Sequence, residues 1–319
     1  MASYRNALPQ TADRLFLTDG GMETTLVFLQ GVELPHFAAF PLVEQPDGAE
    51  RLRAYYRTYL DIARAAGLGF VLETPTWRAN ADWGARLGCD AAALAKVNAK
   101  AVALMAELRD AYAGGGTPVV VSGNIGPRGD GYDPGQVMSE AEAEAYHGQQ
   151  IATFAATEAD LVTAMTLTNV PEAIGVARAA RAHGLPSVIS FTLETDGRLP
   201  TGQTLGDAIE ATDRATDGAP DYYMINCAHP SHFADVLGGR APWLDRVRGL
   251  RANASRRSHA ELDQAPDLDD GDPVALGAEY RALQALLPRL TVLGGCCGTD
   301  HRHVDQICRI CAPPRARAD

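Results

Sequence analysis

Three cysteines stand where apolar, strand-like runs end, and their side chains are the ones in this sequence best suited to chemistry. Cys296 and Cys297 are adjacent within Gly294–Thr299, directly after a short apolar run. Cys227 follows the apolar run 222–226 in the same way. A disulfide between adjacent cysteines is rare because the ring that it closes is strained. Two neighbouring thiolates at the end of a buried strand suit a soft metal ion better.

Zinc bound by three thiolates keeps its fourth tetrahedral position open, and an open position is typical of catalytic rather than structural zinc sites. A lone buried cysteine is usually inert packing, and this alternative stays open for Cys227 taken by itself. It is weaker for the adjacent pair, because Gly294, Gly295 and Gly298 let the backbone turn sharply and approach a ligand. The three cysteines together therefore predict a catalytic zinc site.

The composition excludes several classes of protein. The chain has 319 residues, of which 46% are hydrophobic and 21% charged, as expected for one large globular domain or two small ones. Its net charge of −12 argues against nucleic acid and anionic membranes as partners. Six cysteines in so long a chain do not form a secreted disulfide framework, and residues 1–13 lack the apolar core of a signal peptide. We expect a cytoplasmic protein without a membrane span, and a homo-oligomer is compatible with the sequence.

Strand-like runs alternate with helix-like segments along the whole chain. Strands are predicted at residues 15–18, 70–72, 118–122, 161–164, 187–191, 222–226, 249–253 and 291–294. Helices are predicted at 47–66 and 90–112, from Ser139 onward, and at 171–183, 205–215, 232–237, 244–247, 273–287 and 304–311. No GxGxxG motif follows an early strand, which weakens the case for a dinucleotide-binding sheet. The pattern predicts an α/β protein, a single-domain (β/α)8 TIM barrel over residues 1–319 with a frayed tail at 313–319.

A barrel would bring residues that are distant in the sequence to one rim. Catalytic residues of such barrels lie at the C-terminal ends of the strands. The residues at or just beyond predicted strand ends are Asp19, Thr74, Asn124, Cys227, Asn253, Cys296 and Cys297. Only the seventh strand separates the sixth from the eighth, so Cys227 should lie close to the adjacent cysteine pair. This convergence strengthens the metal hypothesis beyond what each cysteine supports alone.

Three segments resemble the zinc-dependent homocysteine S-methyltransferases, a family that includes betaine- and S-methylmethionine-dependent enzymes. They are Leu17–Glu23, Ile225–Cys227 and Gly294–Gly298, and the resemblance runs from about residue 15 to about residue 310. It implies a methyltransferase of methionine biosynthesis, with a small-molecule thiol acceptor and a methyl donor as partners. It also implies specific roles: zinc ligands at Cys227, Cys296 and Cys297, a homocysteine pocket lined by Asp19 and Gly20, and a pocket threonine at Thr74.

The chemistry also follows from the thiolate site itself. A free thiol has a pKa of roughly 8.5, and binding to zinc favours its thiolate form. An acceptor sulfur at the open position would therefore become nucleophilic. A methyl group on a sulfonium or quaternary ammonium centre is electrophilic and leaves behind a neutral product. Transfer then requires that the methyl group be held close to the sulfur and in line with it.

The sequence departs from the family pattern at two positions. Met165 stands where the family usually has a glutamate that holds the ammonium group of the amino acid, so Asp19, Glu23 or backbone carbonyls are the alternatives here. Arg78 stands where betaine enzymes have a tyrosine, next to an aromatic position at Trp77. Like charges 5 Å apart repel by roughly 3 kcal/mol at an effective dielectric constant of 20. Arg78 therefore argues against betaine and for a donor that carries an anionic group.

These observations lead to one preferred function and two alternatives. We expect methyl transfer from an onium donor, with S-methylmethionine or a similar sulfonium favoured, to homocysteine, yielding methionine. The alternatives are the same chemistry on another thiol or selenol, or an inactive zinc-binding barrel with a role in regulation or assembly. Asn226 is expected either to bind substrate or to fix a loop, and Trp77 and Trp83 either form a donor wall or simply pack. The expected substrate-binding residues are Asp19, Gly20, Glu23, Thr74, Trp77, Arg78 and Asn226.

Overall fold

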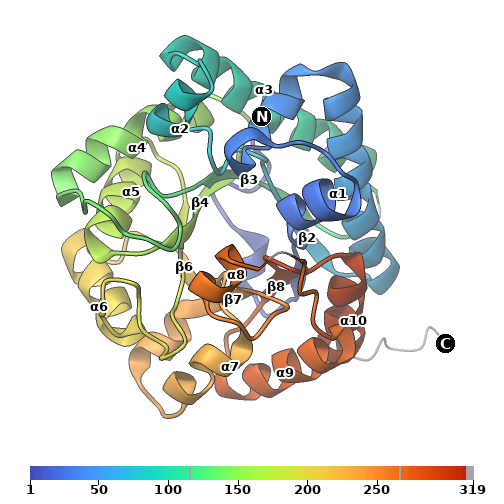
Figure 1. Ribbon diagram of the computed structural model, residues 1–319, viewed down its shortest axis with the longest axis vertical. Coiled ribbons are helices and arrows are strands. Elements are labelled where there is room, and N and C mark those ends of the chain that lie inside the picture. The colour runs from blue at the N-terminus through green and yellow to red at the C-terminus, as the bar shows by residue number, and fades with distance from the viewer. Residues whose placement is uncertain (115, 266, 314–319) are drawn as a thin grey trace.

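A computed structural model describes residues 1–114, 116–265 and 267–313, and eight parallel strands within it close into a barrel in the order β1 to β8 (Figure 1). Hydrogen bonds between β1 and β8 complete the closure. The strands are β1 Phe16–Leu17, β2 Gly69–Glu73, β3 Val119–Ile125, β4 Leu161–Leu167, β5 Ser187–Phe191, β6 Tyr222–Asn226, β7 Val247–Ala252 and β8 Val292–Gly295. The predicted (β/α)8 TIM barrel is confirmed, since each strand overlaps the run that predicted it.

Helices surround the barrel and cover the outer face of its strands (Figure 1). They are α1 Pro46–Ala66, α2 Ala81–Arg86, α3 Ala91–Ala111, α4 Glu140–Ala155, α5 Val170–Ala182, α6 Leu205–Thr216, α7 Pro230–Phe233, α8 His259–Asp263, α9 Pro273–Leu286 and α10 His301–Cys311. The segment predicted at 244–247 is a 3-10 turn at Pro242–Arg246. No helix of the described residues is long and apolar enough to cross a membrane. The predicted frayed tail lies outside the described residues from 314 onward.

Local capping explains where several helices begin and end. Ser139 and Glu142 form a capping box at the start of α4, and Asp90 caps α3 through the backbone amide of Ala93. Helix α1 begins at Pro46, one residue before its predicted start, and the missing N–H of that proline needs no partner. The last helix, predicted over 304–311, begins three residues earlier because Asp300 caps it. The short helices α2 and α8 were not predicted, since single turns show no periodicity.

The barrel interior changes from apolar to polar along the strands. Its apolar part is filled by side chains that include Phe16, Val71, Val120, Leu161, Val188, Tyr222 and Val292. Successive side chains of a strand point to opposite faces, so Glu73, two residues after Val71, also faces the interior. Ser122 and Thr163 join hydroxyls there at 2.8 Å, and Ser190 bonds to Asn226 at 2.6 Å. This polar layer forms the floor of the C-terminal rim.

Candidate metal and substrate site

The three predicted cysteine ligands meet at the C-terminal rim. Cys227 follows β6, and Cys296 and Cys297 follow β8. Their three sulfur atoms all lie within 4.8 Å of one another, and those of Cys227 and Cys297 are 3.9 Å apart. Tetrahedral zinc with Zn–S bonds of about 2.3 Å would place its sulfurs about 3.8 Å apart. The donor set therefore fits a soft metal ion with three protein ligands.

The pKa values of the clustered cysteines are shifted in opposite directions because the thiols hydrogen-bond to one another. The pKa of Cys296 is lowered because Cys227 and Cys297 hydrogen-bond to its thiolate, with help from the positive charge of Arg251. The pKa of Cys227 is raised by the same hydrogen bonds and by burial. A bound dication would favour the thiolate form of all three cysteines.

Strained backbone and close glycines place the sulfurs. Cys227 has a φ of 55°, in the left-handed region that non-glycine residues rarely adopt. His259 Nε2 lies 2.6 Å from the Cys227 carbonyl oxygen, which holds this conformation. A Cβ at Gly294 would collide with the hydroxyl of Thr18, and one at Gly295 with that of Thr299. Glycines therefore let the chain approach β1 as it enters the cysteine pair.

Asn226 fixes the backbone next to Cys227. Its Oδ1 accepts hydrogen bonds from the Thr166 backbone amide at 2.8 Å and from the Ser190 hydroxyl at 2.6 Å. Its Nδ2 donates to Thr166 Oγ1 at 2.8 Å and lies 3.9 Å from the sulfur of Cys296. Thr166 belongs to a bulge in β4 and has a φ of 62°. Of the two roles expected for Asn226, these contacts favour the fixing of backbone.

Asp19 is held by partners within the protein. Its Oδ1 lies 2.8 Å from Arg251 Nη2, an ion-pair distance without hydrogen-bond alignment, and its Oδ2 accepts from the Tyr55 hydroxyl at 2.8 Å. Burial raises the pKa of Asp19 while Arg251 opposes that rise. Arg251 also donates to the carbonyls of Gly20 and Gly295 at 3.1 and 3.0 Å. One arginine on β7 thereby ties the end of β1 to the residue before the cysteine pair.

The other two residues expected in the acceptor pocket also have partners. Gly20 accepts hydrogen bonds from Tyr55 and Arg251, and a Cβ there would lie 2.9 Å from the hydroxyl of Tyr59. Thr74 is 1% exposed, shares a 2.6 Å contact with the Thr76 hydroxyl and accepts from the backbone amide of Asn124. These hydrogen bonds therefore give Gly20 and Thr74 a role in holding the backbone at the strand ends.

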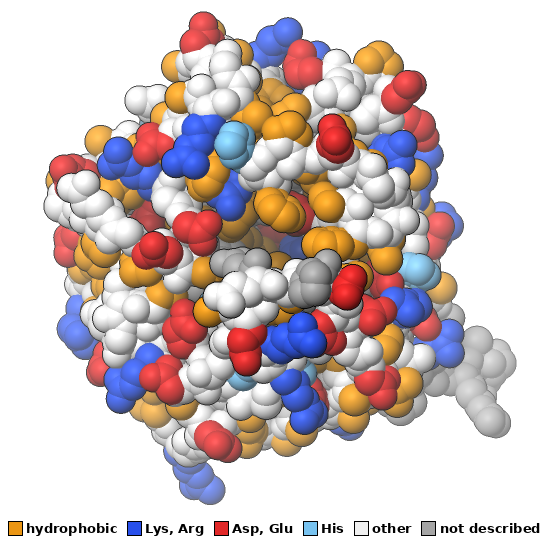
Figure 2. Space-filling model, viewed as in Figure 1, with side chains coloured by type: hydrophobic (Ala, Val, Ile, Leu, Met, Phe, Trp, Pro, Cys, Tyr) orange, Lys and Arg blue, Asp and Glu red, His pale blue; other side chains and the backbone are white. Residues whose placement is uncertain are grey.

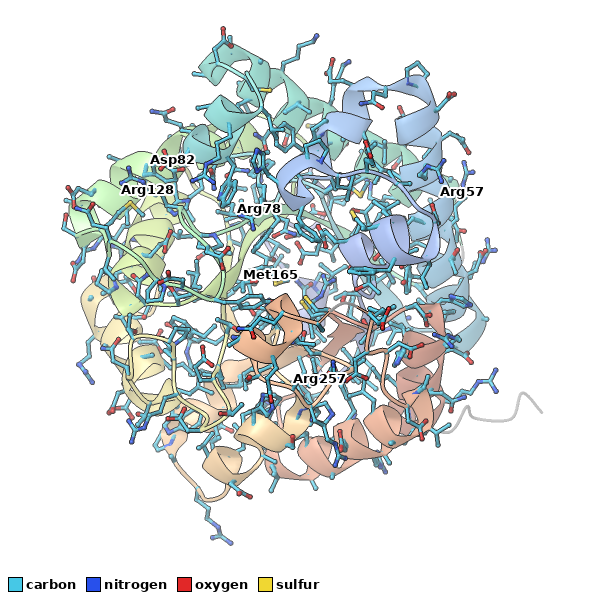
Figure 3. All side chains as sticks on the ribbon, viewed as in Figure 1. Arg57, Arg78, Asp82, Arg128, Met165 and Arg257 are labelled. Carbon is cyan, nitrogen blue, oxygen red and sulfur yellow. The ribbon has the colours of Figure 1, made fainter. Side chains whose placement is uncertain are left out.

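Arg78 lies at the barrel mouth, where Figure 3 labels it. Its side chain is buried and packs between two tryptophans. Its guanidinium carbon lies 3.6 Å from the ring centroid of Trp83 and 4.5 Å from that of Trp77. The side chain is 9% exposed, and its nearest carboxylate oxygen, on Asp130, is 3.8 Å from Nη2. Nε and Nη1 are buried without a hydrogen-bond partner among the described residues. Two donor nitrogens of this immobilised guanidinium are thus available to bind an anion.

Trp77 and Met165 line the rim beside Arg78. Trp77 Nε1 donates to the Met165 carbonyl at 3.3 Å, and Met165 is 4% exposed. A Cβ at Gly126 or Gly131 would meet atoms of Trp77, so the loop after β3 packs closely against the indole. Of the two roles expected for Trp77 and Trp83, these contacts favour packing, with both rings holding the guanidinium.

Two more carboxylates, Glu23 and Glu73, have raised pKa values. Glu23 precedes the π-helix Thr24–Leu29 and is partly exposed, and its pKa is raised to about 7, mainly by burial and also by the nearby charge of Cys296. Glu73, at the end of β2, is 3% exposed, and burial raises its pKa to about 7 as well.

Figure 2 shows a hollow at the centre of the face on which α8 lies, with side chains of both charges inside it.

Sequence reasoning missed Tyr132, which touches the cluster. The residue belongs to the glycine-rich loop between β3 and α4, and its hydroxyl lies 3.3 Å from the sulfur of Cys297. Its ring stacks on His259 with centroids 3.9 Å apart. The one feature of the sequence that could have indicated Tyr132 is the presence of a tyrosine in a glycine-rich loop after a strand.

Cys308 and Cys311, by contrast, are buried in α10 and are not part of the cluster.

Comparisons with known proteins agree with this geometry. Residues 16–311 match the family model described as homocysteine S-methyltransferase. The oxidized form of the homocysteine methyltransferase MmuM from Escherichia coli superposes with a TM-score of 0.73 at 23% identity, over 96% of this chain and 99% of that one. Its metallated form gives 0.71 at 22% identity, over 93% and 96%. The search of curated proteins found no match.

The family match covers nearly the whole barrel, including the rim cysteines and the segment Leu17–Glu23. The resemblance inferred from three short segments is therefore confirmed over the full fold. This chain belongs to the homocysteine S-methyltransferase family and is a methyltransferase.

Proposed function

We propose that this protein is a zinc-dependent enzyme that transfers a methyl group from an onium donor to homocysteine and so forms methionine. The observation that carries the proposal is the group of three sulfur atoms within 4.8 Å at the barrel rim of a chain from this family. Zinc is favoured because an all-thiolate, three-ligand set matches its preferences and leaves one position open. Such thiols must stay reduced, which favours a cytoplasmic setting.

The residues of the chain have separable tasks in this reaction. Cys227, Cys296 and Cys297 would hold the zinc, which when bound favours the thiolate form of the acceptor. Asn226 fixes the Thr166 backbone beside Cys227, and His259 contacts the backbone carbonyl of Cys227 itself. The rim loops would limit the access of water and align the donor methyl with the acceptor sulfur. A lone pair of that sulfur then forms the new S–CH3 bond, and the donor keeps the electron pair of the bond that it loses to the methyl group.

Arg78 supports a sulfonium amino acid as the donor. Its two buried donor nitrogens, Nε and Nη1, have no hydrogen-bond partner among the described residues and suit a carboxylate, and its charge opposes a methyl-bearing onium centre close by. In S-methylmethionine the sulfonium lies further along the chain from the carboxylate than the ammonium does in betaine. Arg78 could therefore bind the carboxylate while the methyl reaches the cysteines.

A donor panel tests this proposal. Zinc-loaded protein is assayed for methionine formation from homocysteine with S-methylmethionine, S-adenosylmethionine, betaine, dimethylsulfoniopropionate and methylated folate. We expect S-methylmethionine to be used best, and betaine to have a kcat/KM at least about 100-fold lower, the ratio that roughly 3 kcal/mol of charge repulsion produces. Efficient use of betaine would contradict the assignment of the donor. No turnover with any donor would contradict the proposed function.

A further inference from the structure

An α-amino acid acceptor brings an ammonium group into a site that must offer it a carboxylate. Burying an ammonium without such a partner is strongly unfavourable. The residue at position 165 is a methionine and carries no charge. Among the described residues, the charge of Asp19 acts on both Glu23 and Glu73, and the charge of Cys296 acts on Asp19 and Glu23.

Two of these carboxylates are buried away from the exposed rim. Asp19 is 2% exposed, paired with Arg251 and hydrogen-bonded by Tyr55. Glu73 is 3% exposed, and its Oε2 is buried without a hydrogen-bond partner among the described residues. Burial therefore keeps both carboxylates from a ligand that approaches the rim from solvent.

Glu23 differs in accessibility and in partners. It is partly exposed and stands two residues after Gly21, where an added Cβ would lie 2.5 Å from the carbonyl oxygen of Cys296. The next residue, Thr24, accepts a hydrogen bond from the backbone amide of Gly298 at 2.9 Å, so this segment runs beside the cysteine pair. Apart from its own backbone amide, no hydrogen bond or ion pair of its carboxylate is found among the described residues. Cys296 acts on its charge, and Glu23 in turn acts on the charge of Arg78. It therefore lies within electrostatic reach of both the metal cluster and the free guanidinium.

We propose that Glu23 is the carboxylate that binds the ammonium group of the acceptor amino acid while the acceptor sulfur lies at the three cysteines. The inference rests on the proposed function and names the group that selects an amino acid over a simple thiol. The raised pKa of Glu23 agrees with it, because a carboxylate whose ionised form lacks a cation is the one that an ammonium stabilises. Arg78 then remains free for the donor.

The test compares homocysteine with 4-mercaptobutyrate, which has the same thiol and carboxylate but no amino group. The variant Glu23→Gln keeps the shape of the side chain and removes its charge. We expect it to lower kcat/KM for homocysteine by about 10- to 100-fold, the range of a charge-assisted hydrogen bond, through KM rather than kcat. Its kcat/KM for 4-mercaptobutyrate should stay within about twofold of the wild-type value. Glu33→Gln, an exposed glutamate of the same loop, serves as the control and should change neither.

Several outcomes would overturn the inference. Equal losses for both acceptors would show that Glu23 does not select the amino group. A loss confined to the KM of the donor would assign Glu23 to the donor instead. Calorimetric binding of homocysteine to the zinc-loaded protein, without any donor, separates this inference from the proposed function. If homocysteine binds and Glu23→Gln weakens that binding, the inference holds even where no methionine forms.

Discussion

Replacing Cys297 with alanine should yield a folded barrel that no longer retains zinc and no longer transfers methyl groups. Removing a group that merely supports a metal ligand typically costs 10- to 100-fold in affinity, and loss of one of three ligands should cost more. We therefore expect zinc to fall from about one per chain to a small fraction of that after dialysis, with turnover at background. Cys227→Ala and Cys296→Ala should behave in the same way. Metal analysis after dialysis and circular dichroism check this result.

The chain supplies its own controls for this experiment. Cys308 and Cys311 lie in α10 and are not part of the rim cluster. Their replacement by alanine should leave both zinc content and turnover near the wild-type level, even if stability falls because both are buried. Undiminished zinc in Cys297→Ala would remove that residue from the ligand set.

Replacing Arg78 with methionine should lower kcat/KM for a sulfonium amino acid by about 10- to 100-fold, because a charge-assisted hydrogen bond contributes roughly 1.5–3 kcal/mol. Methionine is chosen because it keeps much of the apolar stem between Trp77 and Trp83, where alanine would leave a gap. Zinc content and the KM for homocysteine should change little. Arg78→Lys keeps the charge but loses the planar fork and should recover only part of the activity.

Arg86 provides a matched comparison. Its guanidinium carbon lies 4.3 Å from the ring centroid of Trp83, but the side chain is exposed. Arg86→Met should therefore disturb the same tryptophan without removing a buried anion-binding group, and donor use should stay within about twofold of the wild type. If Arg78→Met and Arg86→Met had equal and small effects, Arg78 would be a packing residue, and the argument that it binds the carboxylate of the donor would fail.

The barrel and the convergence of the cysteines could be predicted because both depend on local patterns. Apolar runs that alternate with helical periodicity define the strands, and the C-terminal ends of parallel strands share one rim. The position of Cys227 after β6 and of the cysteine pair after β8 was therefore enough to expect the cluster. Boundaries were less certain where a cap lies outside the periodic pattern, as Asp300 does before α10.

The remainder of the site depends on three-dimensional packing that no local pattern encodes. Arg251 stands between two apolar residues of β7, and only the closed barrel shows that it faces Asp19. Tyr132 reaches Cys297 across 165 residues of sequence from an irregular loop. The sequence placed Arg78 at the rim, but the direction of its side chain and its position between two indoles required the structure.

The central claim is that the acceptor sulfur joins three cysteine sulfurs around a zinc ion, and zinc X-ray absorption tests it most directly. Zinc-loaded protein without substrate should show three sulfur neighbours at about 2.3 Å and one lighter atom. Addition of homocysteine should raise the count to four sulfurs at the same distance. A sulfur count of three that does not change when saturating homocysteine is added would contradict the account.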